Sequence, residues 1–258
     1  MTETTRPATR YDVVSGVAWF TIDRPDARNA ANAAVRADLR EAVRRFNADD
    51  DAHVLVLTGA GDQAFCAGGD LKEMAGTSLG IPTAEHLPHF GHTIPVAKPT
   101  IAAVNGLAYA GGFLLAQMCD LCIAVDHARF AITEVKVGRG APWAAPLPWL
   151  MPPRVAMELL LTGDPIDATR AHQIGLVNAV VSAAELRPTV QALGERIAAN
   201  APLSVRAAKE MVYRMADHPR TEAFTVADEI WNPVYLSQDA QEGPLAFAER
   251  RTPQWTGR

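Results

Sequence analysis

The chain has 258 residues, 48% of them hydrophobic and 21% charged, so it is long enough to bury a sizeable core. Its net charge of −5 gives no basis for a nucleic-acid partner, and three cysteines are too few for a disulfide framework. The first ten residues lack the apolar core of a signal peptide, and no uninterrupted apolar run could span a membrane. We therefore expect a cytoplasmic protein that binds neither nucleic acid nor membrane, with residues 1–10 as a disordered lead-in.

The N-terminal third of the chain alternates strand and helix patterns. Alternating apolar residues around Ser15-Gly16 predict a β-hairpin, and apolar positions at helical spacing predict the helix that follows it. A fully apolar run then predicts a strand covered on both faces, and a glycine-rich turn over 59–69 leads to the next helix. The expected elements are a hairpin over 11–23, a helix over 31–46, a strand over 54–57 and a helix from Leu71.

The most regular part of the chain runs from Lys98 to Ala124. Its elements are a buried strand over 100–104, a turn at Asn105-Gly106, a loop ending in Gly111-Gly112, a helix closing at Cys119-Asp120 and a strand over 121–125. The proline- and tryptophan-rich segment over 138–153 cannot be one regular helix. Later patterns predict helices over 155–161, 168–174, 190–200, 202–217 and 220–237, and a strand over 177–181. Repeated strand–turn–helix units followed by helices predict an α/β core over 11–195 and a helical C-terminal region over 196–258.

Two glycine-bearing loops each open a helix after a buried strand. Gly69 and Gly111-Gly112 lie where the helices begin, so their backbone N–H groups lack intrahelical acceptors and the helix dipole adds positive potential. Two such N–H groups on one carbonyl oxygen polarise a thioester and stabilise its enolate. The alternative for each loop is a tight turn that needs a positive φ.

Several longer strings resemble a known family. AFCAGGDLKEM, KPTIAAVNGLAYAGG, AQMCD, LTGDPIDATRAHQIGLVN and FAERRTPQW are similar to the enoyl-CoA hydratase/isomerase (crotonase) family, over nearly the whole chain from Tyr11. The resemblance implies a crotonase-like spiral of ββα units with a C-terminal helical trimerisation region. It also implies an acyl-CoA thioester as substrate, no separate cofactor, no metal, and a homotrimer or dimer of trimers.

The resemblance also implies roles for individual residues. The backbone N–H groups of Gly69 and Gly111 would form an oxyanion hole, and Leu114 and Trp143 would lie beside the acyl group. Contacts to CoA would fall on the backbone of two stretches, residues 28–30 and 67–72, with Arg28, Ala30, Ala67, Gly68, Asp70, Leu71 and Lys72 as the contact residues.

This sequence departs from the family's hydratases at one of their two glutamates. The position after the glycine pair holds Leu114, whereas Glu134 in FAITEVKVG matches the second glutamate. Two acids let a hydratase activate water and also protonate Cα, but one acid can still carry a proton between Cα and Cγ. With Ala-Pro-Trp at 141–143, the pattern is similar to monofunctional enoyl-CoA isomerases, which keep only the second acid.

Three functions are open at this point. The first is isomerisation of 3-enoyl-CoA to 2-enoyl-CoA, with Glu134 as the sole acid/base. The second is hydration of 2-enoyl-CoA in fatty-acid or other acyl-CoA breakdown, with Glu134 alone handling water. The third is a non-catalytic acyl-CoA-binding protein. For Glu134 itself, the alternative to a catalytic role is a surface carboxylate between two strands.

Other motifs favour structural roles. Gly59, Gly61 and Ala64 match a weak dinucleotide-binding pattern, but their turn does not open a helix at once. No GxSxG elbow supports a serine hydrolase. Metal-ligand spacing occurs at Cys119 and Cys122, without a second pair, and at His86, His89 and His92, where proline and glycine interrupt the helix that would align them.

Two further regions keep simple interpretations. The segment over 76–93 is expected to be a mobile loop beside the acyl pocket. Four arginines, Arg36, Arg40, Arg44 and Arg45, are expected on the solvated face of one helix. Arg250 and Arg251 near the C-terminus either contact CoA phosphates or take no part in binding.

Overall fold

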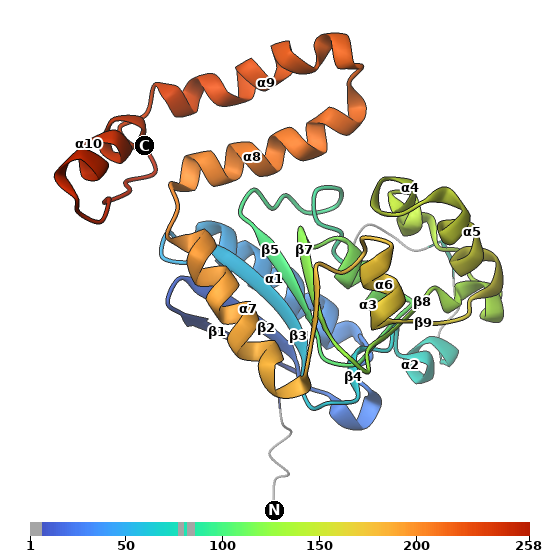
Figure 1. Ribbon diagram of the computed structural model, residues 1–258. Coiled ribbons are helices and arrows are strands. Elements are labelled where there is room, and N and C mark those ends of the chain that lie inside the picture. Colours follow the sequence, from blue (N-terminus) through green and yellow to red (C-terminus); the bar gives the residue numbers. More distant parts are fainter. Residues whose placement is uncertain (1–6, 77–79, 82–85) are drawn as a thin grey trace, which may run out of the picture.

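The computed structural model describes residues 7–76, 80–81 and 86–258, and it contains two β-sheets (Figure 1). The larger sheet has the order β1-β2-β3-β5-β7-β10, and the smaller one has the order β4-β6-β8-β9. The larger sheet consists of Thr9–Val14, Val17–Ile22, Val54–Gly59, Thr100–Val104, Leu121–Val125 and Ala179–Val181. The smaller sheet consists of Ala64–Cys66, Leu107–Tyr109, Arg129–Ala131 and Ile166–Asp167.

The expected hairpin is confirmed by the antiparallel pairing of β1 with β2. Its two turn residues, Ser15 and Gly16, have φ values of 49° and 77°, the left-handed pair that a tight hairpin turn requires. Strand β1 begins at Thr9, inside the segment expected to be a disordered lead-in. Residues 1–6 of that segment lie outside the described residues.

The chain repeats one unit three times, which confirms the spiral of ββα units. Each unit adds a strand to the larger sheet, a strand to the smaller sheet and then a helix. The strands run parallel to those of the neighbouring units. The three units are β3-β4-α2, β5-β6-α3 and β7-β8-η2, with helices at Leu71–Ala75 (α2), Gly111–Gln117 (α3) and Thr133–Val137 (the 3-10 helix η2).

The core lies on both faces of the larger sheet. Helices α1 (Ala33–Ala48) and α7 (Ala183–Ala198) cover opposite faces (Figure 1), and all residues of β2 and β3 are buried, as expected for a sheet covered on both sides. Helix α3 packs against β4, β5 and β6, so it contacts both sheets. Helix α3 is therefore the element that lies between the two sheets.

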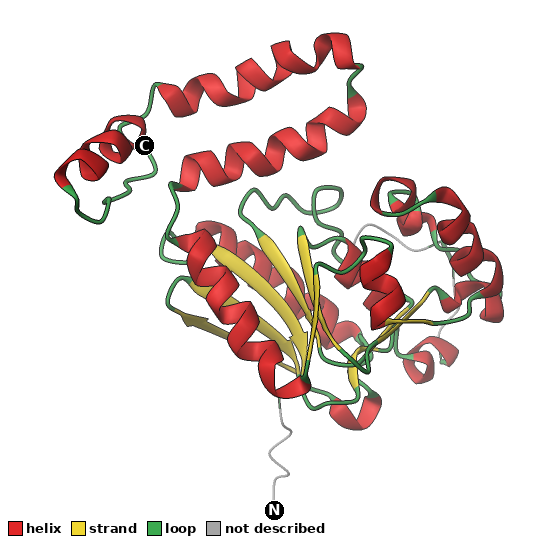
Figure 2. Cartoon of the chain, in the orientation of Figure 1, coloured by secondary structure: helices red, strands yellow, loops and turns green. Residues whose placement is uncertain are grey.

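The remaining helices follow the smaller sheet and the C-terminus (Figure 2). Between β8 and β10 they are η3 (Pro142–Ala144), α4 (Leu147–Leu150), α5 (Pro153–Thr162) and α6 (Ala168–Gln173). These short pieces confirm that the proline-rich segment is not one helix. A short 3-10 turn, η1 (Pro25–Ala27), follows β2.

The C-terminal helices extend away from the two sheets (Figure 1). They are α8 (Pro202–Arg214), η4 (Met215–Asp217), α9 (Arg220–Tyr235) and α10 (Asp239–Glu249). The expected boundary between 195 and 196 falls inside α7, so the chain leaves the core after that helix. Asp120 attaches α8 to the core, since it pairs with Lys209 at 2.9 Å and accepts a 2.8 Å hydrogen bond from Tyr213. Among the described helices, none combines the length and apolar character needed to cross a membrane.

Candidate functional site

The two glycine loops meet at the start of α3. A Cβ built on Gly111 would lie 3.6 Å from Cα of Gly68, so the two loops are in van der Waals contact. Gly68 has a φ of 101°, which an L side chain rarely adopts. Within the described residues, the backbone N–H groups of Gly69 and Gly111 donate to no acceptor. The structure therefore brings together two neighbouring, unsatisfied N–H groups, the arrangement that a developing oxyanion requires.

The approach of α3 to β4 depends on Gly112. A Cβ at this position would lie 1.9 Å from the carbonyl oxygen of Cys66, so any side chain would force the helix away from the strand. Residues 112–117 of α3 are all buried, and Gly111 at its start is half-buried. Close packing thus fixes the second N–H group.

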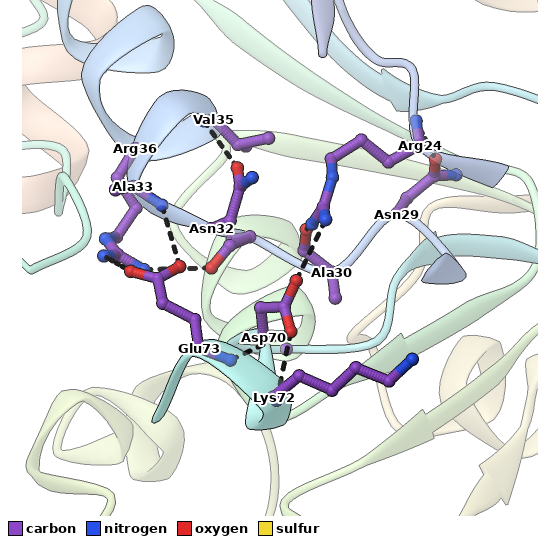
Figure 3. Close-up of polar contacts among 12 residues, drawn as sticks. Arg24, Asn29, Ala30, Asn32, Ala33, Val35, Arg36, Asp70, Lys72 and Glu73 are labelled. Carbon is purple, nitrogen blue, oxygen red and sulfur yellow. Dashed lines mark hydrogen bonds and ion pairs between the residues drawn. The ribbon is translucent and has the colours of Figure 1, made fainter. Parts of the chain in front are cut away.

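The first N–H group is held by polar contacts (Figure 3). Asp70 caps α2, where its Oδ1 accepts from the Lys72 backbone N–H at 3.1 Å, and its Oδ2 pairs with the Arg24 guanidinium at 2.9 Å. Arg24 also donates to the carbonyl oxygen of Ala30. The Arg24 hydrogen bond is the main reason that the pKa of Asp70 is lowered, although burial opposes it. Gly69 directly precedes this capped residue.

A second ion pair joins α2 to the start of α1. The Arg36 guanidinium lies 2.7 Å from Glu73, whose other carboxylate oxygen accepts from the Ala33 backbone N–H at 3.0 Å (Figure 3). The Arg36 side chain is only 16% exposed, so the expectation of a solvated arginine is wrong at this position. Its partner is 37 residues away in the sequence, which helical periodicity cannot reveal.

The two stretches expected to contact CoA are joined to each other by backbone hydrogen bonds next to Gly69. The Ala67 backbone N–H donates to the carbonyl oxygen of Arg28 at 3.1 Å, and the Ala31 N–H donates to that of Gly68 at 2.8 Å. Arg28 has a φ of 50° and an exposed side chain. Two other residues expected at CoA, Leu71 and Lys72, are exposed, and Figure 3 shows the Lys72 side chain pointing away from the ion-paired cluster.

The loop between Arg24 and Ala31 is fixed from beneath by Asn29. This residue is fully buried with a φ of 56°, and its side chain accepts from the Arg24 backbone N–H and donates to Ala60 and Ala64. Sequence reasoning missed Arg24 and Glu73, and it included Asn29 only within the backbone stretch expected at CoA, not as a buried anchor of the loop. The only available signal was asparagine's tolerance of left-handed backbone, which does not identify hydrogen-bond partners.

Glu134 is held in a partly apolar environment. It is half-buried in η2, and within the described residues its buried Oε2 has no hydrogen-bond partner. Burial raises the pKa of Glu134, opposed by its own backbone N–H and by the nearby Trp143 side chain. The alternative of a surface carboxylate between two strands does not describe this residue. A base with a raised pKa and a free oxygen suits proton transfer near neutral pH.

Leu114 lies in the hydrophobic core, three residues after Gly111. Its side chain is 5% exposed and belongs to the same buried cluster as Phe113 and Leu115. A Cβ built on Gly111 would meet Leu87 at 3.3 Å, so the end of the segment expected beside the acyl pocket reaches the glycine loops. Residues 77–79 and 82–85 of that segment lie outside the described residues.

The other candidate clusters have structural surroundings. Cys66, Cys119 and Cys122 are buried, and burial raises the pKa of each thiol. Within the described ranges, no three histidine, cysteine or acidic side chains are grouped to hold a metal ion. Near the C-terminus, Arg251 pairs with Glu242 and Glu249, so intramolecular contacts already engage its guanidinium.

Comparisons with known proteins agree with this geometry. Residues 12–258 match the model of a family described as enoyl-CoA hydratase/isomerase. The chain is 39% identical to an (E)-benzylidenesuccinyl-CoA hydratase from Thauera aromatica over 95% of this chain and 98% of that protein. It is 38% identical to a carnitinyl-CoA dehydratase from Escherichia coli strain K12 over 93% and 94% of the two chains.

Solved structures of similar proteins support the same family. An enoyl-CoA hydratase from Mycobacterium tuberculosis H37Rv superposes with a TM-score of 0.90 at 40% identity, covering 98% of this chain and 100% of that chain. An enoyl-CoA hydratase from Mycobacterium marinum superposes with a TM-score of 0.90 at 39% identity and the same coverage.

Proposed function

The chain belongs to the enoyl-CoA hydratase/isomerase family, and from that premise we propose that it isomerises 3-enoyl-CoA to 2-enoyl-CoA with Glu134 as its sole acid/base. The thioester oxygen would accept hydrogen bonds from the N–H groups of Gly69 and Gly111. These two groups are adjacent and unsatisfied within the described chain, as such a role requires.

The reaction divides into two proton transfers. The Glu134 carboxylate removes a proton from Cα of the 3-enoyl chain, and the electron pair of that C–H bond delocalises onto the thioester oxygen and, through the Cβ=Cγ double bond, onto Cγ. The two N–H groups stabilise the resulting negative charge. The protonated Glu134 then returns the proton to Cγ, which leaves the double bond between Cα and Cβ and restores the carboxylate.

The single observation that favours isomerisation over hydration is Leu114. Hydration needs a water molecule to be oriented and activated while Cα receives a proton, which is a task for two acids. Leu114 places a buried aliphatic side chain on the oxyanion helix at the position where the family's hydratases have the other glutamate. A single carboxylate is sufficient for isomerisation because the proton it removes is the proton it returns.

Hydration of 2-enoyl-CoA is the second candidate. It is favoured by the names of similar proteins, which are a hydratase and a dehydratase of acyl-CoA substrates. In this chain Glu134 alone would have to deprotonate water, and its buried, unpaired Oε2 would be the oxygen that faces it.

A substrate panel separates the two candidates. Wild type, Glu134→Gln and Leu114→Glu would be assayed on 3-enoyl-CoA and 2-enoyl-CoA, with Glu158→Gln as a control at an exposed carboxylate. We expect isomerisation to be the faster reaction and to fall about 10²- to 10⁴-fold in Glu134→Gln. Faster hydration that survives this substitution would overturn the proposal. A sharp gain of hydration in Leu114→Glu would support the view that the missing acid limits hydration.

The third possibility, binding of acyl-CoA without catalysis, has its own test. A catalyst that forms the enolate exchanges protons at Cα and Cγ with solvent, and this exchange should depend on Glu134. Binding without any exchange of deuterium from heavy water would show that catalysis has been lost.

We also propose contacts and an assembly for this enzyme. Arg28 and Lys72 lie in the two stretches expected at CoA, and their exposed, positively charged side chains suit the phosphates of CoA. The C-terminal helices expose large apolar side chains, which a trimer or a dimer of trimers would cover. These include Val212, Phe224, Tyr235, Leu236 and Phe247. Light scattering of the purified protein tests the assembly, and a monomer would contradict it.

A further inference from the structure

Cys66, the last residue of β4, contacts both glycine loops of the proposed oxyanion hole. Its Sγ accepts a hydrogen bond from the Gly68 backbone N–H at 3.4 Å and donates to the carbonyl oxygen of the same residue at 3.7 Å. Its own carbonyl group and Cβ occupy the space that a Cβ on Gly112 would need. Cys66 is fully buried, so water does not compete for these contacts.

The direction of the Gly69 N–H follows from that of the Gly68 carbonyl group. These two groups belong to one planar trans peptide, so they point in opposite directions. The Gly68 carbonyl oxygen accepts a 2.8 Å hydrogen bond from the Ala31 N–H and also contacts the Cys66 thiol. Both partners lie on the carbonyl side of the peptide. The Gly69 N–H therefore points to the other side, where it has no acceptor among the described residues.

The backbone of Gly68 does not hold this orientation by itself. Its φ is 101°, and glycine has the greatest conformational freedom of all residues. The thiol contacts the N–H and the carbonyl of Gly68 at once, so a rotation of this backbone breaks one of the two contacts. Burial raises the pKa of the Cys66 thiol to about 11, so the sulfur keeps its proton at neutral pH and can both donate and accept.

The same residue also limits the position of the second donor. Gly112 packs on the main chain of Cys66, and Gly111 directly precedes it in α3. A Cβ built on Gly68 would lie 3.5 Å from the backbone nitrogen of Gly111. The sulfur of Cys66 thus holds the loop of the first N–H group, and its main chain supports the helix that carries the second.

We propose that Cys66 is a positioning residue of the oxyanion hole: its thiol holds the Gly68–Gly69 peptide so that the Gly69 N–H is directed to the same oxygen as the Gly111 N–H. This inference rests on the proposed function, in which that oxygen belongs to the thioester. Because the thiol is fully buried, it acts on the glycine loop and does not touch the substrate.

Cys66→Ala tests the proposal because it removes the sulfur and keeps the main chain that packs against Gly112. Bonds to the oxyanion strengthen in the transition state, so their loss lowers kcat more than it raises KM. Complete loss of one donor costs about 10²- to 10³-fold in kcat. For a donor that has lost only its orientation, we expect a fall of about tenfold in kcat for 3-enoyl-CoA, with KM nearly unchanged.

A second measurement needs no turnover. Butanoyl-CoA labelled with ¹³C at the thioester carbonyl would be bound to the protein, and its carbonyl stretch recorded by infrared difference spectroscopy. Hydrogen bonds from the two N–H groups lower this stretching frequency relative to the free thioester. We expect a clear lowering in wild type and a smaller one in Cys66→Ala.

Three further variants make the result specific. Cys66→Ser keeps a group that donates and accepts, so it should recover most of kcat and of the frequency shift. Cys66→Val fills the volume of the sulfur without a hydrogen-bonding atom, so it should be impaired as Cys66→Ala is. Cys122→Ala is the matched control, because the Cys122 thiol is also buried and has no hydrogen bond among the described residues. It should match wild type in both measurements.

A purely structural role for Cys66 gives a different pattern. It would lower the melting temperature of Cys66→Ala and leave the carbonyl frequency at its wild-type value, which would overturn the proposal. Equal losses in Cys66→Ser and Cys66→Ala would overturn it too. If wild type itself shows no lowering of the frequency, the proposed oxyanion hole fails, and this inference fails with it. If wild type shows the lowering but Glu134→Gln keeps full activity, only the proposed role of Glu134 fails.

Discussion

Helices α2 and α3 are held in place by different physical means. Each begins at or just after a glycine whose backbone N–H has no acceptor among the described residues, and these two N–H groups form the proposed oxyanion hole. All residues of α2 are exposed or half-buried, and two arginine–carboxylate pairs hold it in place. Residues 112–117 of α3 are buried, and contact between Gly112 and Cys66 holds it in place. One N–H depends on charges and the other on close packing.

This difference between α2 and α3 indicates which parts of the site tolerate substitution. Packing at α3 leaves no space for another atom, so substitutions there act through steric overlap and affect the whole core. Ion pairs at α2 are partly exposed, so they respond to pH, salt and single substitutions without disturbing the core. We therefore expect damage at α3 to appear as lost folding, and damage at α2 to appear as altered substrate binding.

The largest effect is expected from Gly112→Ala, which would break the α3 side of the comparison. The added Cβ would lie 1.9 Å from a backbone oxygen, and backbone cannot move aside as a flexible side chain can. We expect a loss of at least about 3 kcal/mol in unfolding free energy, measured by urea denaturation, or an insoluble protein.

Gly76→Ala, at the end of α2, is the matched control for that substitution. A Cβ there would meet its nearest neighbour at an ordinary 3.6 Å, and the backbone is right-handed with a φ of −85°. This variant should fold and act as wild type does. Equal stability of the two alanine variants would contradict the contrast between the two helices.

An intermediate effect is expected from Arg24→Gln on the α2 side. The Arg24 and Asp70 side chains are 22% and 15% exposed, so their pair contributes more than a surface ion pair, and we expect a loss of about 2 kcal/mol. KM for the acyl-CoA substrate should rise because the Gly69 loop is no longer fixed. The double variant Arg24→Gln/Asp70→Asn should be more stable than the sum of the single losses predicts.

Arg44→Gln is the control for the Arg24 experiment. Its pair with Glu41 is 64% and 72% exposed, and exposed pairs of this kind contribute about 0–1 kcal/mol. Its substitution should leave both stability and KM nearly unchanged. If the stability losses of the Arg24 and Asp70 substitutions are strictly additive, the ion pair between the two residues does not contribute to stability.

The smallest effect is a pH dependence that only the α2 side should show. The pKa of Asp70 is lowered in the folded protein, so this residue stabilises the fold above its unfolded pKa, near 3.9, and that stabilisation is lost as pH falls through the lowered value. Urea midpoints of wild type and Asp70→Asn should converge as pH falls from 5 to 3. Asp12→Asn, at an exposed carboxylate of β1, should keep the wild-type slope.

Much of the fold could be predicted from the sequence because its longer elements carry clear patterns. The strand over 100–104, the turn after it and the helix from Gly111 were placed closely, and the β1–β2 hairpin turn was exact at Ser15-Gly16. Strands β4, β6 and β8 were missed. Each has three residues, which is too few to show a period of two, and β4 lies inside a glycine-rich stretch that predicts a turn.

The candidate site, too, could be predicted only in part from the sequence. Local sequence identified Gly69 and Gly111, because glycines before helices are visible in a short window, and the family resemblance identified Glu134. It did not identify the contacts that hold them. Arg24–Asp70 and Arg36–Glu73 join residues 46 and 37 positions apart, and such pairs become visible only when the chain is folded. The catalytic roles themselves stay predictions.

Helix α3 also sets a fixed length within the site. Its first residue supplies the proposed oxyanion donor, and the side-chain amide of its last residue, Gln117, donates to the carbonyl oxygen of Trp143. A helix rises about 1.5 Å per residue, so these two ends are about 9 Å apart along its axis. Backbone hydrogen bonds set that length, and loop movement does not alter it. In the proposed mechanism, the thioester and the segment around Trp143 are therefore kept at a fixed separation, whatever the length of the acyl chain.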